Sequence, residues 1–122
     1  MALRDQIRIM VVDDMSTSRG LITQGLDGFG IRQVESAADG PSALQKLAKW
    51  PVHLVISDMN MPGMNGLQLL HTLRSAAQTR NVGFLLITGK ADRQIIETGK
   101  NLGMKTSLPT PFQPTDLRNA IE

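Results

Sequence analysis

The stretch VHLVISDMNMPGMNGLQLLHTL, residues 52–73, contains a strand signal, a loop signal and a helix signal in immediate succession. Its first six residues are nearly all apolar, as expected for a strand that is buried on both faces of a sheet. Asn65-Gly66 then introduces a segment whose leucines recur at helical spacing. Asp58 falls at the junction between the strand and the loop, so this stretch bears on chemistry as well as on fold.

Similar apolar runs recur on both sides of this stretch, with amphipathic segments between them. The predicted strands cover residues 7–12, 33–38, 52–57, 82–88 and, more weakly, 105–108. The predicted helices begin near Ser16 or Thr17, after Asp39-Gly40, after Asn65-Gly66, near Ala91 and near Pro114-Thr115. Five strands that alternate with five helices predict an α/β fold with a parallel sheet covered on both faces. Right-handed crossovers then favour a flavodoxin-like, doubly wound, five-stranded sheet of order 2-1-3-4-5.

Capping residues and apolar periodicity give more local expectations for the helices. Ser16 or Thr17 is a good N-cap for the first helix, and Gly103 is expected to follow the end of the fourth. Gln113 or Thr115 could cap the last helix. The residues predicted to face inward from the first helix are Leu21, Ile22, Gly25 and Leu26.

Length and composition restrict the class of protein. A chain of 122 residues with 41% hydrophobic and 20% charged residues is typical of one globular domain. It has no cysteine, which excludes disulfides and thiolate metal sites, and its apolar runs are too short to cross a bilayer. The net charge is +2, and three phenylalanines and one tryptophan are too few for a base-stacking platform. We therefore expect a cytoplasmic protein that binds neither nucleic acid nor membranes.

Oxygen-bearing side chains follow four of the predicted strands. Asp13 and Asp14 follow the first strand, Asp58 the third, Thr88 stands at the end of the fourth, and Thr110 follows the fifth. Ligands of open α/β sheets bind beyond the carboxyl ends of the strands, so these residues are expected at one site. A single aspartate is as well explained by a turn or a cap. Three of them at the ends of inner strands favour a functional site.

Three converging carboxylates repel one another, and this raises their pKa values or requires a cation. Oxygen ligands without histidine or cysteine select a hard ion, Mg²⁺ or Mn²⁺ rather than zinc. Carboxylates with Mg²⁺ suggest phosphoryl chemistry, and the absence of a P-loop motif points to an aspartyl phosphate rather than a bound nucleotide. The central third strand selects Asp58 as the acceptor, and Asp13 and Asp14 are then predicted to hold the metal. Thr88 can donate a hydrogen bond to a phosphoryl oxygen.

Four motifs occur along the chain in this order: VVDDMSTSR (11–19), ISDMNMPGMNG (56–66), LLITGKA (85–91) and PTPF (109–112). Together they resemble the receiver domains of two-component response regulators, most closely the stand-alone chemotaxis regulators, over essentially the whole chain. The resemblance implies a single receiver domain over residues 1–122 without an output domain. It implies phosphorylation of Asp58 by a histidine kinase or a small-molecule donor, and a downstream target such as a flagellar-motor protein. Such a protein is a phosphoacceptor that catalyses only its own phosphorylation and dephosphorylation.

The resemblance also implies a set of metal ligands. Asp14 and Asp58 would bind Mg²⁺ directly, Asp13 would act through water, and the backbone carbonyl of Asn60 would supply a further ligand. Thr88 matches the switch threonine of the family.

Two positions depart from the family pattern at the fifth strand. A nearly universal lysine is replaced by Thr110, and the aromatic residue expected three positions earlier is Ser107. A neutral hydroxyl cannot make a charge-assisted bond worth roughly 1.5–3 kcal/mol, so weakened switching is expected. Lys90 could reach the phosphate, although an ordinary solvated lysine is the favoured interpretation. The resemblance implies that the bond between Thr110 and Pro111 is a candidate cis peptide. Pro109 favours an edge strand, because proline cannot donate to the sheet.

Alternative functions follow from the same residues. A phosphate sink would drain a shared kinase without driving an output, and Thr110 and Ser107 favour it. A dedicated phosphatase of the haloacid-dehalogenase type needs a second aspartate where this chain has Asn60. An interaction module that is never phosphorylated is disfavoured by the intact Asp13, Asp14, Asp58 and Thr88.

Overall fold

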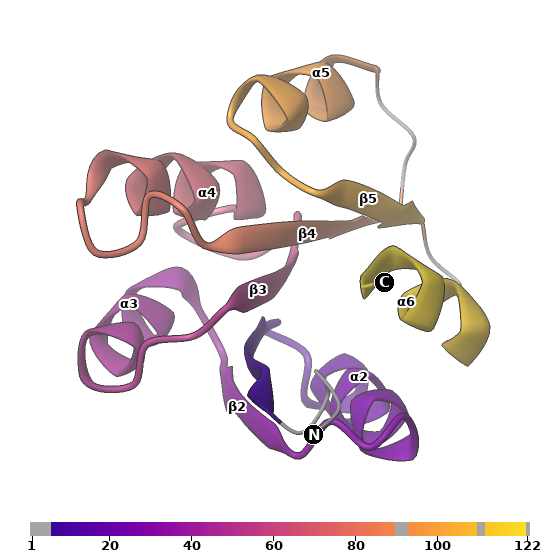
Figure 1. The fold of residues 1–122 in the computed structure, drawn as a ribbon. Coiled ribbons are helices and arrows are strands. Elements are labelled where there is room, and N and C mark those ends of the chain that lie inside the picture. Colours follow the sequence, from indigo (N-terminus) through magenta and orange to yellow (C-terminus); the bar gives the residue numbers. More distant parts are fainter. Residues whose placement is uncertain (1–5, 90–92, 110–111, 122) are drawn as a thin grey trace.

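The computed structural model describes residues 6–89, 93–109 and 112–121, and these form a layered α/β domain (Figure 1). Five parallel strands are paired in the order β2-β1-β3-β4-β5. The strands are β1 (Arg8–Val12), β2 (Gln33–Ala37), β3 (Leu54–Asp58), β4 (Gly83–Thr88) and β5 (Thr106–Pro109). The predicted fold class and strand order are confirmed, and Pro109 lies on an edge strand as expected.

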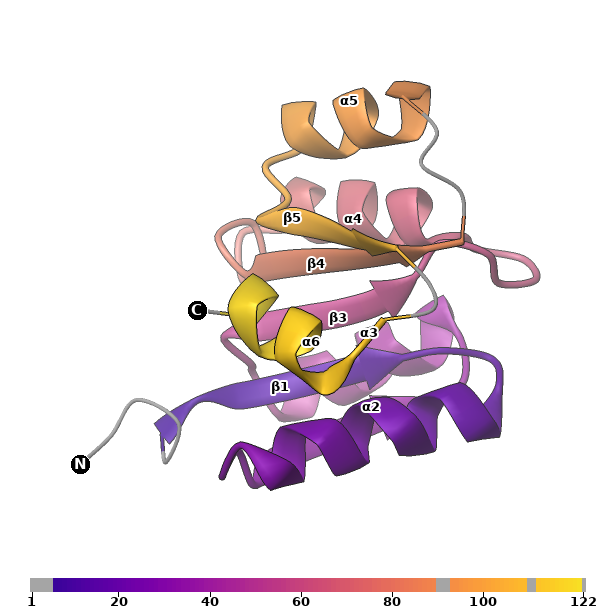
Figure 2. The same ribbon diagram turned by 90° about the vertical axis from the view of Figure 1, so that its right-hand side faces the viewer.

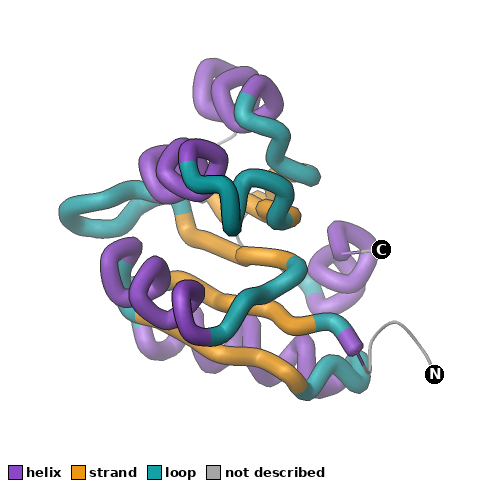
Figure 3. The backbone as a smooth tube through the Cα atoms, turned by 60° about the vertical axis from the view of Figure 1, so that its left-hand side comes forward, coloured by secondary structure: helices purple, strands orange, loops and turns teal. Residues whose placement is uncertain are grey.

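Helices cover both faces of the sheet (Figure 3). The helices in the described residues are α2 (Ser16–Gly28), α3 (Gly40–Lys49), α4 (Gly66–Ser75), α5 (Arg93–Asn101) and α6 (Pro114–Ile121). Helices α2 and α6 lie on one face of the sheet, and α3, α4 and α5 lie on the other (Figures 1 and 2). The side chains of each group belong to a separate hydrophobic core. No helix in these described ranges is long and apolar enough to span a membrane.

The two cores arise from the alternation of side chains along each strand. In β1, Ile9 and Val11 point to the face that carries α2 and α6, and Met10 and Val12 point to the opposite face. All four side chains are fully buried. The inner strands are therefore apolar on both faces, which explains the nearly continuous apolar runs of the sequence.

Two helices begin beside the Asp39-Gly40 and Asn65-Gly66 dipeptides, as predicted, and the structure adds the caps. The Asp39 carboxylate accepts a hydrogen bond from the backbone N–H of Ser42 at 2.8 Å and caps α3. Asn65 and Gln68 form a reciprocal capping box at the start of α4, with both hydrogen bonds at 2.8 Å. After α5, Gly103 adopts a φ of +77°, a left-handed conformation that suits glycine at the end of a helix.

The first helix corrects two predictions. Its N-cap is Met15 without a side-chain capping bond, and Ser16 is already helical, so neither Ser16 nor Thr17 caps it. Leu21 is 63% exposed and does not face the core, whereas Ile22 and Leu26 are buried. Successive residues of a helix are rotated by about 100°, so Leu21 turns away when Ile22 and Leu26 face the sheet.

Of the two remaining predicted helix starts, only that of α6 lies in the described residues. Thr115 lies inside α6 and does not cap it; the backbone N–H of Gln113, just before the helix, donates to the Asp116 carboxylate at 2.9 Å. Ala91, the expected start of the fourth helix, lies outside the described residues.

Candidate functional site

The three aspartates that follow β1 and β3 come together at the carboxyl edge of the sheet. One carboxylate oxygen from each of Asp13, Asp14 and Asp58 lies within 4.8 Å of the others. The two strands are neighbours, with Val12 paired to Ser57, so the residues that follow them lie side by side. Asp13 is buried, Asp58 is half-buried and Asp14 is exposed. The structure thus brings together the acids that the strand pattern placed at one edge.

Asp13 is fixed by its backbone and by one of its carboxylate oxygens. Its Oδ1 accepts a hydrogen bond from the backbone N–H of Met15 at 2.9 Å, and its carbonyl oxygen accepts one from Arg19 Nη1 at 2.7 Å. Burial raises the pKa of Asp13, and the charge of Asp14 adds to this effect. The Met15 N–H and the Arg19 guanidinium act in the opposite direction. One oxygen of Asp13 is therefore already engaged within the protein.

Asp58 is the acid most strongly affected by this arrangement. Burial, followed by the charges of Asp13 and Asp14, raises its pKa from 3.8 to about 6. The backbone amides of Met59 and Asn60 oppose the increase. Both of the charges that act on Asp58 are negative, so a cation at this place would relieve their repulsion. The donor set consists of hard oxygen atoms, and it fits Mg²⁺.

Of the other residues predicted for the site, the structure describes Thr88, Asn60 and Ser107. Thr88 is the last residue of β4 and is 3% exposed. Asn60 is exposed and lines the same pocket as the three acids. Ser107 lies in β5 opposite Leu86. Thr110, Pro111 and Lys90 lie outside the described residues, so the predictions about the missing lysine, the cis peptide and Lys90 stay predictions.

Gly66 lies against the acceptor strand, a contact that its sequence motif does not reveal. Its backbone N–H donates to the carbonyl oxygen of Met59 at 2.9 Å. A Cβ at this position would lie only 2.6 Å from the carbonyl oxygen of Asp58 and 3.0 Å from the Cα of Met59. Glycine is therefore required for the start of α4 to approach the acceptor. Asn65-Gly66 signalled a helix start in the sequence, but it did not reveal this contact.

The acids open into a larger cavity that the sequence did not indicate. This cavity, about 620 Å³ in volume, continues from the acids between α2 and α6. We call this apolar continuation the α2/α6 groove; its lining residues are Met15, Leu21, Ile22, Gly25, Phe112 and Leu117. Leu21, which the helical pattern predicts to face the core, is instead exposed at this surface.

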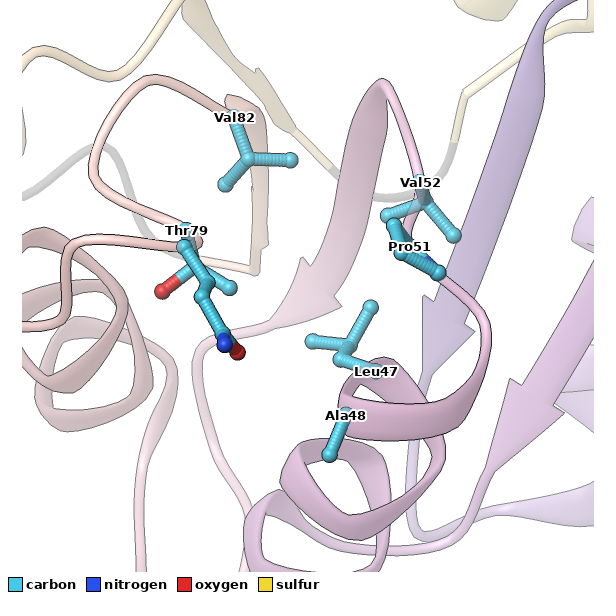
Figure 4. Close-up of a pocket in the computed structure, with 7 residues that line it drawn as sticks. Leu47, Ala48, Pro51, Val52, Thr79 and Val82 are labelled. Atoms are coloured by element: carbon cyan, nitrogen blue, oxygen red, sulfur yellow. The ribbon is translucent and has the colours of Figure 1, made fainter.

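A second cavity, of about 390 Å³, lies at the opposite end of the sheet (Figure 4). It is lined by the C-terminal part of α3, by Pro51 and Val52 before β3, and by Gln78, Thr79 and Val82 before β4. None of these lining residues is acidic, and the cavity is separate from the aspartates.

Comparison with known proteins agrees with this geometry. The family model described as the response regulator receiver domain matches residues 9–122. A probable chemotaxis protein CheY of Rhizobium etli is 35% identical over 122 residues, which cover 100% of this chain and 95% of the relative. Chemotaxis protein CheY-3 of Vibrio cholerae is 32% identical over 120 residues, which cover 98% of this chain and 92% of the relative.

Solved structures give the same result. The structure of CheY4 from Vibrio cholerae, crystallised at low pH, superposes with a TM-score of 0.88 at 31% identity, covering 94% of this chain and 95% of that one. A putative response regulator from Chloroflexus aurantiacus gives a TM-score of 0.87 at 29% identity, with 94% and 93% covered. On the matched family, the relatives and the shared fold, this chain belongs to the response regulator receiver domains and is CheY-like.

Proposed function

We propose that this receiver domain is a cytoplasmic chemotaxis response regulator that accepts a phosphoryl group on Asp58 from a histidine kinase in a Mg²⁺-dependent reaction. The observation that carries the proposal is the cluster of Asp13, Asp14 and Asp58, which gathers three oxygen ligands at the carboxyl edge of the sheet. The names of the chemotaxis relatives support a role in chemotaxis. The downstream target in this proposal is a flagellar-motor protein.

The metal would be held by Asp14, Asp58 and the backbone carbonyl of Asn60, with Asp13 acting through water. The exposure of Asp14 and the engagement of one Asp13 oxygen by Met15 support this division of roles. When bound, Mg²⁺ supplies positive charge that offsets the charge of the carboxylates and of the phosphoryl oxygens. The protein supplies the acceptor and its orientation.

Asp58 acts as the nucleophile in its ionised form. With a pKa of about 6, most of this carboxyl group is ionised at neutral pH even before a cation binds. One carboxylate oxygen forms the new bond to phosphorus, the bond from phosphorus to the imidazole nitrogen of the donor histidine breaks, and the electron pair leaves with the imidazole. We assign to Thr88, at the end of the neighbouring strand β4, a hydroxyl hydrogen bond to a phosphoryl oxygen.

The test uses acetyl phosphate as a small donor, with intact mass as the readout. Wild type should gain the mass of one phosphoryl group in the presence of Mg²⁺ and not in the presence of EDTA. Asp58→Asn should gain none under either condition. A mass gain that persists in Asp58→Asn would reject Asp58 as the acceptor.

A phosphate sink, or a receiver with weakened switching, is the second candidate, and Thr110 and Ser107 favour it. A phosphoryl group shifts a conformational equilibrium only through its differential affinity for the two states, and a neutral Thr110 offers it less than a lysine would. Beryllofluoride should therefore cause small amide shifts in α5 and β5 of wild type and larger shifts in Thr110→Lys, as measured by NMR.

Lys90 is the rival cation in this experiment. If it has taken over the role of the missing lysine, Lys90→Ala should weaken beryllofluoride binding in wild type but have little effect in Thr110→Lys. A full wild-type response that survives Lys90→Ala would contradict the weakened-switch interpretation. Phosphotransfer kinetics beside a second regulator would then test whether the domain drains the kinase.

A further inference from the structure

We propose that the α2/α6 groove is a subsite for the hydrocarbon part of a small-molecule acyl phosphate whose phosphoryl group is transferred to Asp58. The inference rests on the proposed function, because it names the class of small donor that the same acceptor would prefer. It assigns to the groove a specificity for acyl chains longer than acetyl.

The groove starts at the acids and leads away from them. Asp13, Asp14 and Asp58 share one continuous cavity with the groove residues. Along α2, the lining runs from Ser18 to Gly25, seven residues later, which is roughly 10 Å of helix. A Cβ on Gly25 would lie 3.3 Å from Leu117 Cδ2, so α2 and α6 approach each other closely there and narrow the far end. Figure 2 shows these two helices on the same face of the sheet.

The walls of the groove are apolar and accessible. Met15 is 59% exposed and Leu21 is 63% exposed, and they are the large apolar side chains that the described part of the chain leaves open. Both line the groove together with the buried side chains of Ile22 and Leu117. A single exposed leucine is ordinary, but here two exposed side chains continue a buried apolar surface that ends at three carboxylates.

The acidic end and the apolar end of the cavity match the phosphoryl group and the hydrocarbon chain of an acyl phosphate. Its phosphoryl group would lie at the carboxylates with their cation, and its hydrocarbon chain would lie between α2 and α6. The volume of about 620 Å³ is in the range of sites that enclose a small molecule. A polar donor such as phosphoramidate would leave the apolar walls in contact with water and gain nothing from them.

The transfer is balanced without a further reactant. A carboxylate oxygen of Asp58 forms a bond to phosphorus, and the bond between phosphorus and the bridging acyl oxygen breaks. The electron pair leaves with that oxygen, so the products are the aspartyl phosphate and a free carboxylate. No proton has to be supplied to the leaving group, and the hydrocarbon chain can stay in the groove throughout the step.

The size of the expected preference follows from apolar burial. Each buried methylene contributes ~0.8 kcal/mol, which corresponds to about fourfold in a rate constant. Butyryl phosphate has two methylenes more than acetyl phosphate, so the preference can reach about 15-fold if both are buried. Butyrate and acetate are carboxylates of nearly equal basicity, and the intrinsic reactivity of the two donors is therefore matched.

The experiment measures second-order rate constants for phosphorylation of the full chain in Mg²⁺, by intact mass, with acetyl phosphate, butyryl phosphate and phosphoramidate. Wild type should react with butyryl phosphate about tenfold faster than with acetyl phosphate. Leu21→Ser should lower this ratio several-fold. Gln24→Ser is the matched control, since Gln24 is an exposed residue of the same helix that does not line the cavity, and it should keep the ratio. Thermal unfolding checks that both variants are folded.

Each outcome supports or overturns the subsite. Equal rate constants for the two acyl phosphates, with phosphoramidate still labelling Asp58, would overturn it and leave the proposed function intact. The subsite is also overturned if the ratio of the butyryl phosphate to the acetyl phosphate rate constant is the same in Leu21→Ser as in Gln24→Ser. That result would leave the groove as a surface for a macromolecular partner. If none of the three donors labels Asp58, the proposed function fails and the subsite fails with it.

Discussion

The carboxyl group of Asp58 links the stability of the fold to pH. Its pKa is raised from 3.8 to about 6 in the folded protein by burial and by the charges of Asp13 and Asp14. Between these two values the folded state binds more protons than the unfolded state. The contribution of Asp58 to stability is therefore most favourable below about pH 4 and is lost as the pH rises through 6. At neutral pH without a cation, the ionised carboxylate destabilises the fold.

Asp58→Asn should consequently stabilise the cation-free protein at pH 7.5. The amide has no charge to bury, and the expected gain is roughly 1–2 kcal/mol after allowance for solvent screening of a half-exposed group. The gain should vanish near pH 4, where the wild-type carboxyl group is protonated in the folded state. Urea unfolding in EDTA at both pH values measures the difference, and an equal gain at both would show that the repulsion is not its cause.

Asp13 and Asp14 should contribute unequally to Mg²⁺ binding. Asp13 is buried and has one oxygen engaged by Met15, whereas Asp14 is exposed. If Asp14 binds the ion directly and Asp13 acts through water, Asp14→Ala should abolish measurable affinity. Asp13→Ala should weaken binding by about 10-fold to 100-fold, as is typical of groups outside the first coordination sphere. Calorimetric titration with Mg²⁺ decides, and equal or reversed losses would contradict the assignment of ligands.

At the scale of elements, the position of α4 depends on the absence of a side chain at Gly66. Gly66→Ala would place a Cβ 2.6 Å from the carbonyl oxygen of Asp58, so α4 or the acceptor strand must shift. We expect a loss of about 1–3 kcal/mol and slower phosphorylation of Asp58. Gly20→Ala is the control, because nothing lies within 4 Å of its Cβ in the middle of α2, and it should stabilise by roughly 0.5–1 kcal/mol. Urea unfolding measures both variants. Equal changes in the free energy of unfolding would argue against the close approach of α4 to Asp58.

The sequence predicts elements well where the signals are local. The apolar strands and the helix starts beside Asp39-Gly40 and Asn65-Gly66 are determined by neighbouring residues, and the structure confirms them. The first helix is harder, since Leu21 and Ile22 are adjacent and equally apolar. Which of them is buried depends on contacts with the sheet and α6, which are distant in sequence.

The candidate site also has features that the sequence predicts and features that it does not. Convergence of Asp13, Asp14 and Asp58 follows from the strand ends of a parallel sheet, so strand order alone sufficed to predict it. The approach of Gly66 to Asp58 depends on the path of the loop between them, and the α2/α6 groove depends on how two helices pack. Neither feature has a sequence motif, because both arise from tertiary packing.

At the scale of the whole molecule, Arg74 joins three segments at the end of the sheet opposite the acids. From the last turn of α4, its Nε donates to Leu102 O at 2.6 Å, Nη1 to Val82 O at 2.8 Å and Nη2 to Gly103 O at 3.1 Å. The guanidinium thus holds α4, the start of β4 and the turn between α5 and β5 together. Partial burial lowers the pKa of Arg74, and the three carbonyls stabilise its charge.

Replacing Arg74 should therefore loosen the α5–β5 turn as well as lower global stability. Arg74→Met removes all three hydrogen bonds, and we expect a loss of about 2–4 kcal/mol in urea unfolding. Arg74→Lys keeps the charge, but an ammonium lacks the planar fork that reaches three carbonyls, so it should lose nearly as much. Hydrogen exchange should accelerate at the amides of Met104 and Lys105 in both variants. Arg93→Met, which breaks an exposed ion pair with Glu97, should cost less than about 1 kcal/mol. A lysine variant as stable as wild type would show that charge alone holds these segments together.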